Sequence, residues 1–299
     1  MVVRGAFNHL LRPGLRKDFR DSYNQFPEEY SRILRVGTQD RAHIEATHLA
    51  GLPRQPLRGE VEPVAYLDPV MGDKIEYVDS EYALGFQISK RMMEDDLYGK
   101  AKQNSKWLGR STRLTQEYLA AALLDDAFDG NTFTGVNGDT LCETTHALLN
   151  SAAVGSNRLA TDVQLGITGL QAAYDLAENT IDETGDPIPI MLDTLIINIA
   201  DVWVAEQIAK SELEPYTADN QINAIKSRKS YNVVVSHYKT QGNDWFLRDS
   251  SLHDAHFAFR VRPQFVDSYD EDTWAAKFAA RQRINVYFFD WRGWIGSNP

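Results

Sequence analysis

The side chains of this sequence that could carry out chemistry are few, and one pair stands out. Cys142 and His146 are four residues apart and combine a thiol with a base, the two groups that a cysteine hydrolase uses. Catalytic partners are normally distant in sequence, and no neighbouring basic side chain would lower the pKa of the Cys142 thiol. We therefore interpret Cys142 as structural and keep a cysteine hydrolase that uses it as a remote alternative.

Metal-binding patterns in the sequence are incomplete. His253 and His256 form an H-x-x-H pair without the third ligand or the H-E-x-x-H context that zinc requires. Asp126 and Asp129 resemble part of a calcium loop, but Val136 stands where such a loop needs its glutamate. No glycine-rich phosphate-binding motif and no G-x-S-x-G motif occurs. We therefore predict no catalytic residue, no cofactor and no metal ion.

The composition is that of an ordinary folded protein. Of the 299 residues, 43% are hydrophobic and 24% are charged, which argues against wholesale disorder. No apolar run approaches the ~18 residues of a membrane span, and the N-terminus lacks the pattern of a signal peptide. A single cysteine excludes an internal disulfide and suits a reducing cytoplasm. We predict no contact with a membrane.

Charge is distributed unevenly along the chain. The net charge of −11 argues against tight binding of nucleic acid, which requires a basic surface. The first 20 residues contain one acid, Asp18, and five basic residues, so they carry +4 and leave −15 for the remainder. These basic residues are Arg4, Arg12, Arg16, Lys17 and Arg20. The segment suits an arm that lies on an acidic neighbouring surface, or alternatively a frayed, solvated terminus.

The region 34–92 has the pattern of an extended ribbon. Apolar and polar side chains alternate over 42–46 and over 82–88, the two-residue period of a strand with one wet face. The intervening stretch 50–73 contains four prolines, and a two-stranded ribbon is marginally stable alone in water. We therefore expect the ribbon to contact other copies of the chain. The predicted contact residues are Leu52, Leu57, Val64, Tyr66, Tyr82 and Phe86, together with Arg4, Arg12, Arg16 and Arg20 of the arm.

The remainder of the chain predicts a mixed α+β fold. A helix over 93–128 would span ~50 Å, and alternation over 274–288 predicts one long strand. Between them, residues 161–250 predict a compact α/β unit whose first helix starts at a capping box formed by Thr161 and Gln164. A buried strand over 188–197, a helix over 199–210, and strands over 231–238 and 245–248 follow. Without repeated βαβ units, a mixed sheet is favoured over a doubly wound one.

The order of these parts resembles the major capsid proteins of tailed bacteriophages, which have the Hong Kong 97-type fold. The segment L-C-E-T-T-H at 141–146, followed by N-R-L-A-T at 157–161, is similar to the loop after the spine helix in many phage capsid sequences. The ending D-W-R-G-W-I-G-S at 290–297 resembles that of a subgroup related to the heads of Mu-like phages.

This resemblance implies both a domain organisation and a function. The organisation is an N-terminal arm, 1–33, an extended loop, 34–92, a peripheral domain of 93–160 and 251–299 with the spine helix, and an axial domain, 161–250. The function is that of a structural protein without enzymatic activity. Its copies would form hexamers and pentamers of an icosahedral shell around double-stranded DNA, which they contact weakly and without sequence specificity.

The same resemblance suggests partners and a location. A portal and, given the short arm, a separate scaffolding protein are expected partners. Assembly would take place in the host cytoplasm, and the finished protein would lie in the virion. An encapsulin-like shell that holds cargo enzymes is the main alternative, because it shares the fold.

Overall fold

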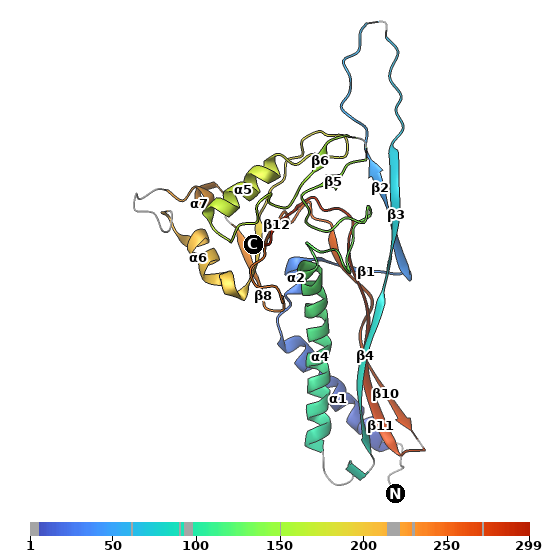
Figure 1. Ribbon diagram of the computed structural model, residues 1–299. Coiled ribbons are helices and arrows are strands. Elements are labelled where there is room, and N and C mark those ends of the chain that lie inside the picture. The colour runs from blue at the N-terminus through green and yellow to red at the C-terminus, as the bar shows by residue number, and fades with distance from the viewer. Residues whose placement is uncertain are drawn as a thin grey trace. The chain divides into compact units, whose positions relative to one another are not determined.

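The chain folds into two units, which are described separately. The computed structural model describes residues 6–60, 62–89, 91–92, 98–149, 151–213, 222–228, 231–270 and 272–299 (Figure 1). The first unit combines Met1–His43, Val78–Ala120 and Phe257–Val286, and the second combines Ile44–Tyr77, Ala121–His256 and Tyr287–Pro299. Among the described residues, no helix is both long and apolar enough to cross a membrane.

A four-stranded sheet with two very long strands forms the frame of the first unit. Its order is β1 (Arg35–Thr38), β10 (Ala255–Asp270), β11 (Ala275–Phe288) and β4 (Ser80–Ser89). β4 runs antiparallel to β11, with Phe86 opposite Phe278. The 14 residues of β11 confirm the long strand that alternation over 274–288 predicts. The two-residue period therefore outweighs the frequent alanines, which also suit a helix.

Two long helices complete the first unit, α1 (Ala6–Gln25) and α4 (Tyr98–Asp125), with a single turn, α2 (Tyr30–Ile33), between them. Leu15 of α1 is buried in a cluster with Ala101 of α4, and Phe19 of α1 is buried in a second cluster with Leu108 of α4. A Cβ atom at Gly109 would come within 2.5 Å of the Phe19 carbonyl oxygen, so this glycine allows the two helices to approach closely. Ser105 Oγ donates to the Leu15 carbonyl oxygen at 2.6 Å.

The helix predicted over 93–128 is confirmed, with a shorter end. Residues 93–97 lie outside the described part of the chain, and α4 ends at Asp125. The carboxylate of Asp126 accepts the backbone N–H groups of Asn131, Thr132 and Phe133 at 2.6–2.9 Å. Gly130 follows with φ of +62°, a conformation that favours glycine. Asp126 therefore fixes the loop that follows α4 through these three hydrogen bonds.

A second four-stranded sheet lies at the centre of the second unit. Its order is β12 (Trp294–Ser297), β9 (Trp245–Arg248), β7 (Thr194–Asn198) and β8 (Asn232–Ser236). β7 is parallel to β8 and antiparallel to β9, so the sheet is mixed, as predicted. Its core includes Leu170, Leu195 and Trp245. The helices of this unit are α5 (Ile167–Glu178), α6 (Val202–Lys210) after the short turn η1 (Ile199–Asp201), and α7 (Ala224–Arg228).

The predicted start of α5 is wrong. The helix begins at Ile167, and Gly166 before it is extended and makes no side-chain cap. The preceding segment is held by the sheet instead, because Val163 accepts a hydrogen bond from Trp245 Nε1 at 2.9 Å and donates its N–H to Ser297 Oγ at 2.9 Å. These contacts with distant residues outweigh the local capping pattern of Thr161 and Gln164.

The extended loop differs from the prediction in its pairing. β2 (His43–Ala50) pairs with β3 (Val70–Val78) as a two-stranded ribbon, whereas the predicted second strand, β4, belongs to the four-stranded sheet. Residues 51–69 join β2 to β3 and extend beyond the end of the ribbon (Figure 1). A further short pair, β5 (His146–Ala147) with β6 (Val154–Gly155), lies in the segment after α4.

Candidate assembly surfaces

The loop 51–69 exposes the large apolar side chains that the sequence predicts as contacts. Leu57 is 100% exposed and Tyr66 is 92% exposed, and Leu52 and Val64 are also more than half exposed. Other large apolar side chains around them are similarly exposed: Leu49, Leu67 and Met71. Apolar surface gathered on one segment in this way is typical of sites that bind another protein.

The two predicted contact residues of β4 have different surroundings. Phe86 packs against Phe278 with ring centroids 5.3 Å apart, and it also contacts the buried clusters around Leu15 and Phe19. This packing within the chain argues against Phe86 as a contact between subunits. Tyr82, the other predicted contact residue, is half-buried. The sequence interpretation missed Leu84, which lies on the same strand and is 57% exposed.

The predicted N-terminal arm is helical and packs against its own chain. Its apolar residues Leu15 and Phe19 are buried, so the described part is not a free arm. Arg4 and the side chain of Arg12 lie outside the described residues. Arg16 and Arg20 are exposed and remain available for contact with an acidic surface.

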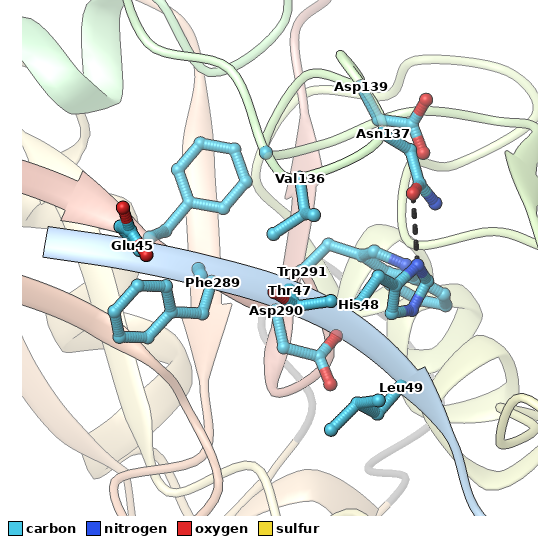
Figure 2. Close-up of a pocket in the computed structure, with 13 residues that line it drawn as sticks. Glu45, Thr47, His48, Leu49, Val136, Asn137, Asp139, Phe289, Asp290 and Trp291 are labelled. Carbon is cyan, nitrogen blue, oxygen red and sulfur yellow. Dashed lines mark hydrogen bonds between the residues drawn. The ribbon is translucent and has the colours of Figure 1, made fainter. Parts of the chain in front are cut away.

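Glu183 anchors the ribbon within the second unit. Its carboxylate forms ion pairs with Nε2 of His48 on β2, at 2.9 Å, and with Nη2 of Arg292, at 2.7 Å, and it accepts the Leu149 N–H at 2.9 Å. The other nitrogen of His48, Nδ1, lies 3.0 Å from Oδ1 of Asn137 (Figure 2). Because both ring nitrogens face acceptors, this geometry favours the doubly protonated ring.

The charges of this anchor stabilise each other. The hydrogen bond with Glu183 raises the pKa of His48 above 6.5, although burial opposes this shift. Burial alone would raise the pKa of Glu183, but contacts with His48, the Leu149 N–H and Arg292 outweigh it and lower the pKa to about 2. The sequence interpretation missed the anchor, because its residues are far apart in the chain.

We expect the anchor to make subunit stability depend on pH. The stabilisation that protonated His48 gives the folded subunit is complete below its ordinary pKa of 6.5 and is lost as pH rises through the raised pKa. The stabilisation from ionised Glu183 is lost only at low pH, as pH falls from 4.5 through about 2. Denaturant unfolding of dispersed subunits above pH 6.5 should therefore show falling stability. The variant His48→Gln should flatten this fall, and an equal fall in wild type and variant would contradict the assignment.

A cavity of about 400 Å³ lies beside the anchor (Figure 2). Three segments of the second unit line it: residues 45–49 of β2, the turn 135–139 and residues 288–291. Its wall combines apolar side chains, such as Leu49 and Trp291, with the acids Glu45, Asp139 and Asp290. The base of the ribbon is thus lined by acidic groups.

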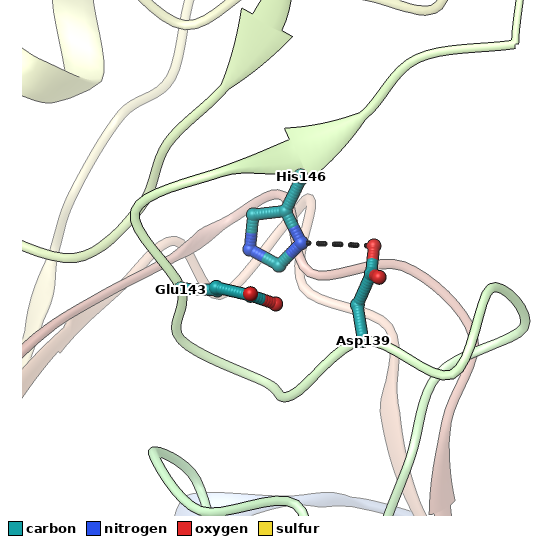
Figure 3. A group of neighbouring side chains, drawn as sticks. All are labelled: Asp139, Glu143 and His146. Atoms are coloured by element: carbon teal, nitrogen blue, oxygen red, sulfur yellow. Dashed lines mark hydrogen bonds and ion pairs between the residues drawn. The ribbon is translucent and has the colours of Figure 1, made fainter.

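The structure does not pair Cys142 with the base that a hydrolase would need. Cys142 is fully buried, and burial raises the pKa of its thiol far above the ordinary value, so the reactive thiolate is disfavoured. The ring nitrogens of His146 face Oδ1 of Asn157, at 2.8 Å, and Oδ2 of Asp139, at 3.3 Å (Figure 3). The two side chains therefore do not form the thiol–base pair of a cysteine hydrolase.

The histidine pair of the H-x-x-H pattern does not converge on a metal site. His256 Nε2 lies 2.6 Å from Asp254 Oδ1, and its ring stacks on Tyr287. His253 is buried against Trp294. Within the described residues, the one group of three side chains that could ligate a metal is Asp139, Glu143 and His146. None of these three residues lies in the H-x-x-H pair or in the partial calcium loop.

The chain matches a family of known proteins. Residues 76–296 match the model of a family described as phage capsid protein. The chain belongs to this phage capsid protein family. No curated protein sequence matches the chain.

Solved structures agree with the family. The procapsid protein of bacteriophage JBD30 matches with a TM-score of 0.54 and 17% identity over 99% of this chain and 76% of that chain. A protein of Mycobacterium phage Adephagia matches with a TM-score of 0.55 and 10% identity, over 92% and 90% of the two chains. A virus-like particle from Pyrococcus furiosus matches with a TM-score of 0.50 and 10% identity, over 95% and 97%. At such low identity these matches show the fold.

The predicted Hong Kong 97-type capsid fold is therefore confirmed, and the protein is a phage capsid protein. The capsid structure of the cyanophage P-SCSP1u, with a TM-score of 0.55 and 12% identity over 88% of this chain and 85% of that chain, shares the same fold. The specific relation to Mu-like heads stays a prediction. Exposed apolar residues of a loop are thus expected features of a subunit that packs against its own copies.

Proposed function

We propose that this capsid protein is the major subunit of an icosahedral phage shell and that its loop 51–69 binds a neighbouring subunit. The observation that carries the proposal is the exposure of Leu57 and Tyr66, which pack on nothing within the described chain. Burying one such side chain is worth roughly 1.5–3 kcal/mol. Because this gain is not realised in the single subunit, it is available to stabilise the assembled shell.

The remaining parts suit the organisation that the family resemblance implies. We assign 1–33 as the N-terminal arm, 34–92 as the extended loop, 93–160 with 251–299 as the peripheral domain, and 161–250 as the axial domain. On the axial domain, Ile199 and Trp203 are 60% and 76% exposed, which suits contacts between subunits of one hexamer or pentamer. From the arm, Arg16 and Arg20 can contact acidic surface of a neighbour.

The partners follow from charge and from the shell itself. A net charge of −11 suits a wall that packaged DNA touches weakly and without sequence specificity. A portal, a separate scaffolding protein and assembly in the host cytoplasm complete the proposal. The shell role is structural, and the lack of pairing between the buried Cys142 and the base His146 supports a subunit without enzymatic activity.

An encapsulin-like compartment is the alternative with the same fold, and the match to the virus-like particle from Pyrococcus furiosus keeps it in view. The family match favours the phage shell, because it covers residues 76–296 and is described as phage capsid protein. Neighbouring genes separate the two functions, since terminase and portal genes accompany a phage shell and a cargo enzyme gene accompanies a compartment.

Assembly of the purified protein tests the proposal. Size-exclusion chromatography with light scattering should detect hexamers, pentamers or larger particles, and negative-stain electron microscopy should show closed shells. Addition of a scaffolding partner should increase the yield of regular shells. A monomer at every protein and salt concentration, with and without that partner, would contradict the proposal.

A further inference from the structure

Asn157 determines which nitrogen of the buried His146 ring carries a hydrogen. Its Nδ2 atom donates to the carbonyl oxygens of Leu141 and Trp291, at 2.7 and 3.3 Å, so the amide oxygen is the atom that faces His146. This oxygen accepts the Glu143 N–H at 2.9 Å and lies 2.8 Å from Nε2 of His146. Because an amide oxygen is only an acceptor, Nε2 carries a hydrogen, and in the neutral ring Nδ1 has a lone pair.

The Nδ1 atom points toward two carboxylates. Oδ2 of Asp139 lies 3.3 Å from it, and one carboxylate oxygen of Glu143 belongs to the same group, whose three donor atoms all lie within 4.8 Å of one another (Figure 3). A metal ion between these atoms would bind the ring nitrogen and the carboxylate oxygens together. The fully buried ring of His146 therefore directs one of its nitrogens at a group of atoms that can ligate a metal.

The three side chains suit a metal ion as a common partner. The contact of Nδ1 with Asp139 joins only two of them. A metal ion can bind all three groups. Two ligands about 2.1 Å from a tetrahedral zinc ion lie about 3.4 Å apart, close to the 3.3 Å between Nδ1 and the Asp139 oxygen.

The surroundings of His146 are those of a metal-binding histidine. Such a ring usually donates its second N–H to a protein oxygen, which fixes its tautomer and its orientation. Here Asn157 accepts that hydrogen, and the indole of Trp291 stacks on the ring with centroids 4.2 Å apart and planes 4° from parallel. Asp139 and Glu143 are partly exposed, so an ion can enter and keep a water ligand.

We propose that Asp139, Glu143 and His146 bind a divalent transition-metal ion, for which one nitrogen and two carboxylate oxygens are ligands that zinc accepts. The ion would join the turn 135–139 to β5. The same turn carries Asn137, which contacts His48 of the ribbon. Metal binding thus stabilises the base of the loop that contacts neighbouring subunits, a role in addition to the shell function.

Zinc titration of particles or dispersed subunits, stripped with EDTA and dialysed, tests the proposal. Calorimetry should show one zinc ion per chain, and zinc should raise the melting temperature. Asp139→Asn and Glu143→Gln should each weaken binding by at least about tenfold. The matched control Glu45→Gln removes the same charge beside the neighbouring cavity and should bind zinc as wild type does.

Two further measurements distinguish the alternatives. Co²⁺ in place of zinc should show d–d absorption without the thiolate charge-transfer band that ligation by Cys142 would produce. In EDTA, Asp139→Asn should be at least as stable as wild type, because the introduced amide can donate to Nδ1 of His146. Failure of wild type to bind zinc stoichiometrically, or undiminished binding in both ligand variants, would overturn the proposal. A marked loss of stability in metal-free Asp139→Asn would also overturn it, since it would show that Asp139 serves the metal-free fold through its contact with His146.

Discussion

Replacing residues 51–69 by a short Gly/Ser linker should abolish shell assembly while the melting temperature of the dispersed subunit stays within about 3 °C of wild type. Among the described residues of this loop, the one ion pair or side-chain hydrogen bond with the rest of the subunit is that of Arg54 with Asp186, and the Arg54 side chain is 86% exposed. Such exposed pairs contribute about 0–1 kcal/mol. β2 ends at Ala50 and β3 begins at Val70, so the replacement leaves the pairing of these two strands intact.

Two matched variants separate the apolar contacts of this loop from its length. A full-length loop with serine at the exposed apolar positions should also fail to assemble, and these positions are Leu52, Leu57, Val64, Tyr66 and Leu67. A loop with neutral polar residues at Arg58, Glu60 and Glu62 should assemble. Light scattering and electron microscopy measure assembly, and calorimetry measures subunit unfolding. A linker variant that forms normal shells would show that the loop is dispensable, and one that unfolds the subunit would show that the loop packs on its own chain.

The variant Asp79→Asn should lower the free energy of subunit unfolding by about 3 kcal/mol, because a buried charge pair is broken on one side. Asp79 lies directly before β4, and its side chain is completely buried. Its carboxylate contacts Nε of Arg283 on β11 at 2.6 Å and Nη1 of Arg260 on β10 at 3.4 Å. An amide at this position cannot balance two guanidinium groups, so three strands of the sheet lose a common anchor.

Glu81→Gln provides the matched control for this second prediction. Glu81 lies two residues further on, and its carboxylate is 3.9 Å from Arg281, with both side chains about half exposed. Its replacement should change the free energy of unfolding by less than about 0.5 kcal/mol. Denaturant unfolding of dispersed subunits measures both variants. Equal effects of the two substitutions would contradict the special role of the buried carboxylate.

The sequence alone was enough to predict those features that depend on local pattern. The two-residue period over 274–288 predicted β11, and the strand predicted over 245–248 coincides with β9. Prolines in 50–73 predicted a segment without regular pairing, and the structure has such a segment over 51–69, because β3 already begins at Val70. The wide spacing of the apolar residues in this segment predicted that they would not form a core, and they are exposed. Such features follow from the chain itself, because strand alternation and proline geometry involve neighbouring residues.

Only the tertiary structure decided which distant residues meet. β4 pairs with β11 and not with β2, and this register packs the partly buried Phe86 against Phe278. The anchor of His48, Glu183 and Arg292 and the donor group around His146 combine segments whose proximity no local period encodes. The helix α1 likewise packs on α4, because burying Leu15 and Phe19 there outweighs the solvation of a basic arm. Strand pairing, side-chain burial and the meeting of charged groups involve residues that are far apart in the chain. They therefore depend on the free energy of the whole fold.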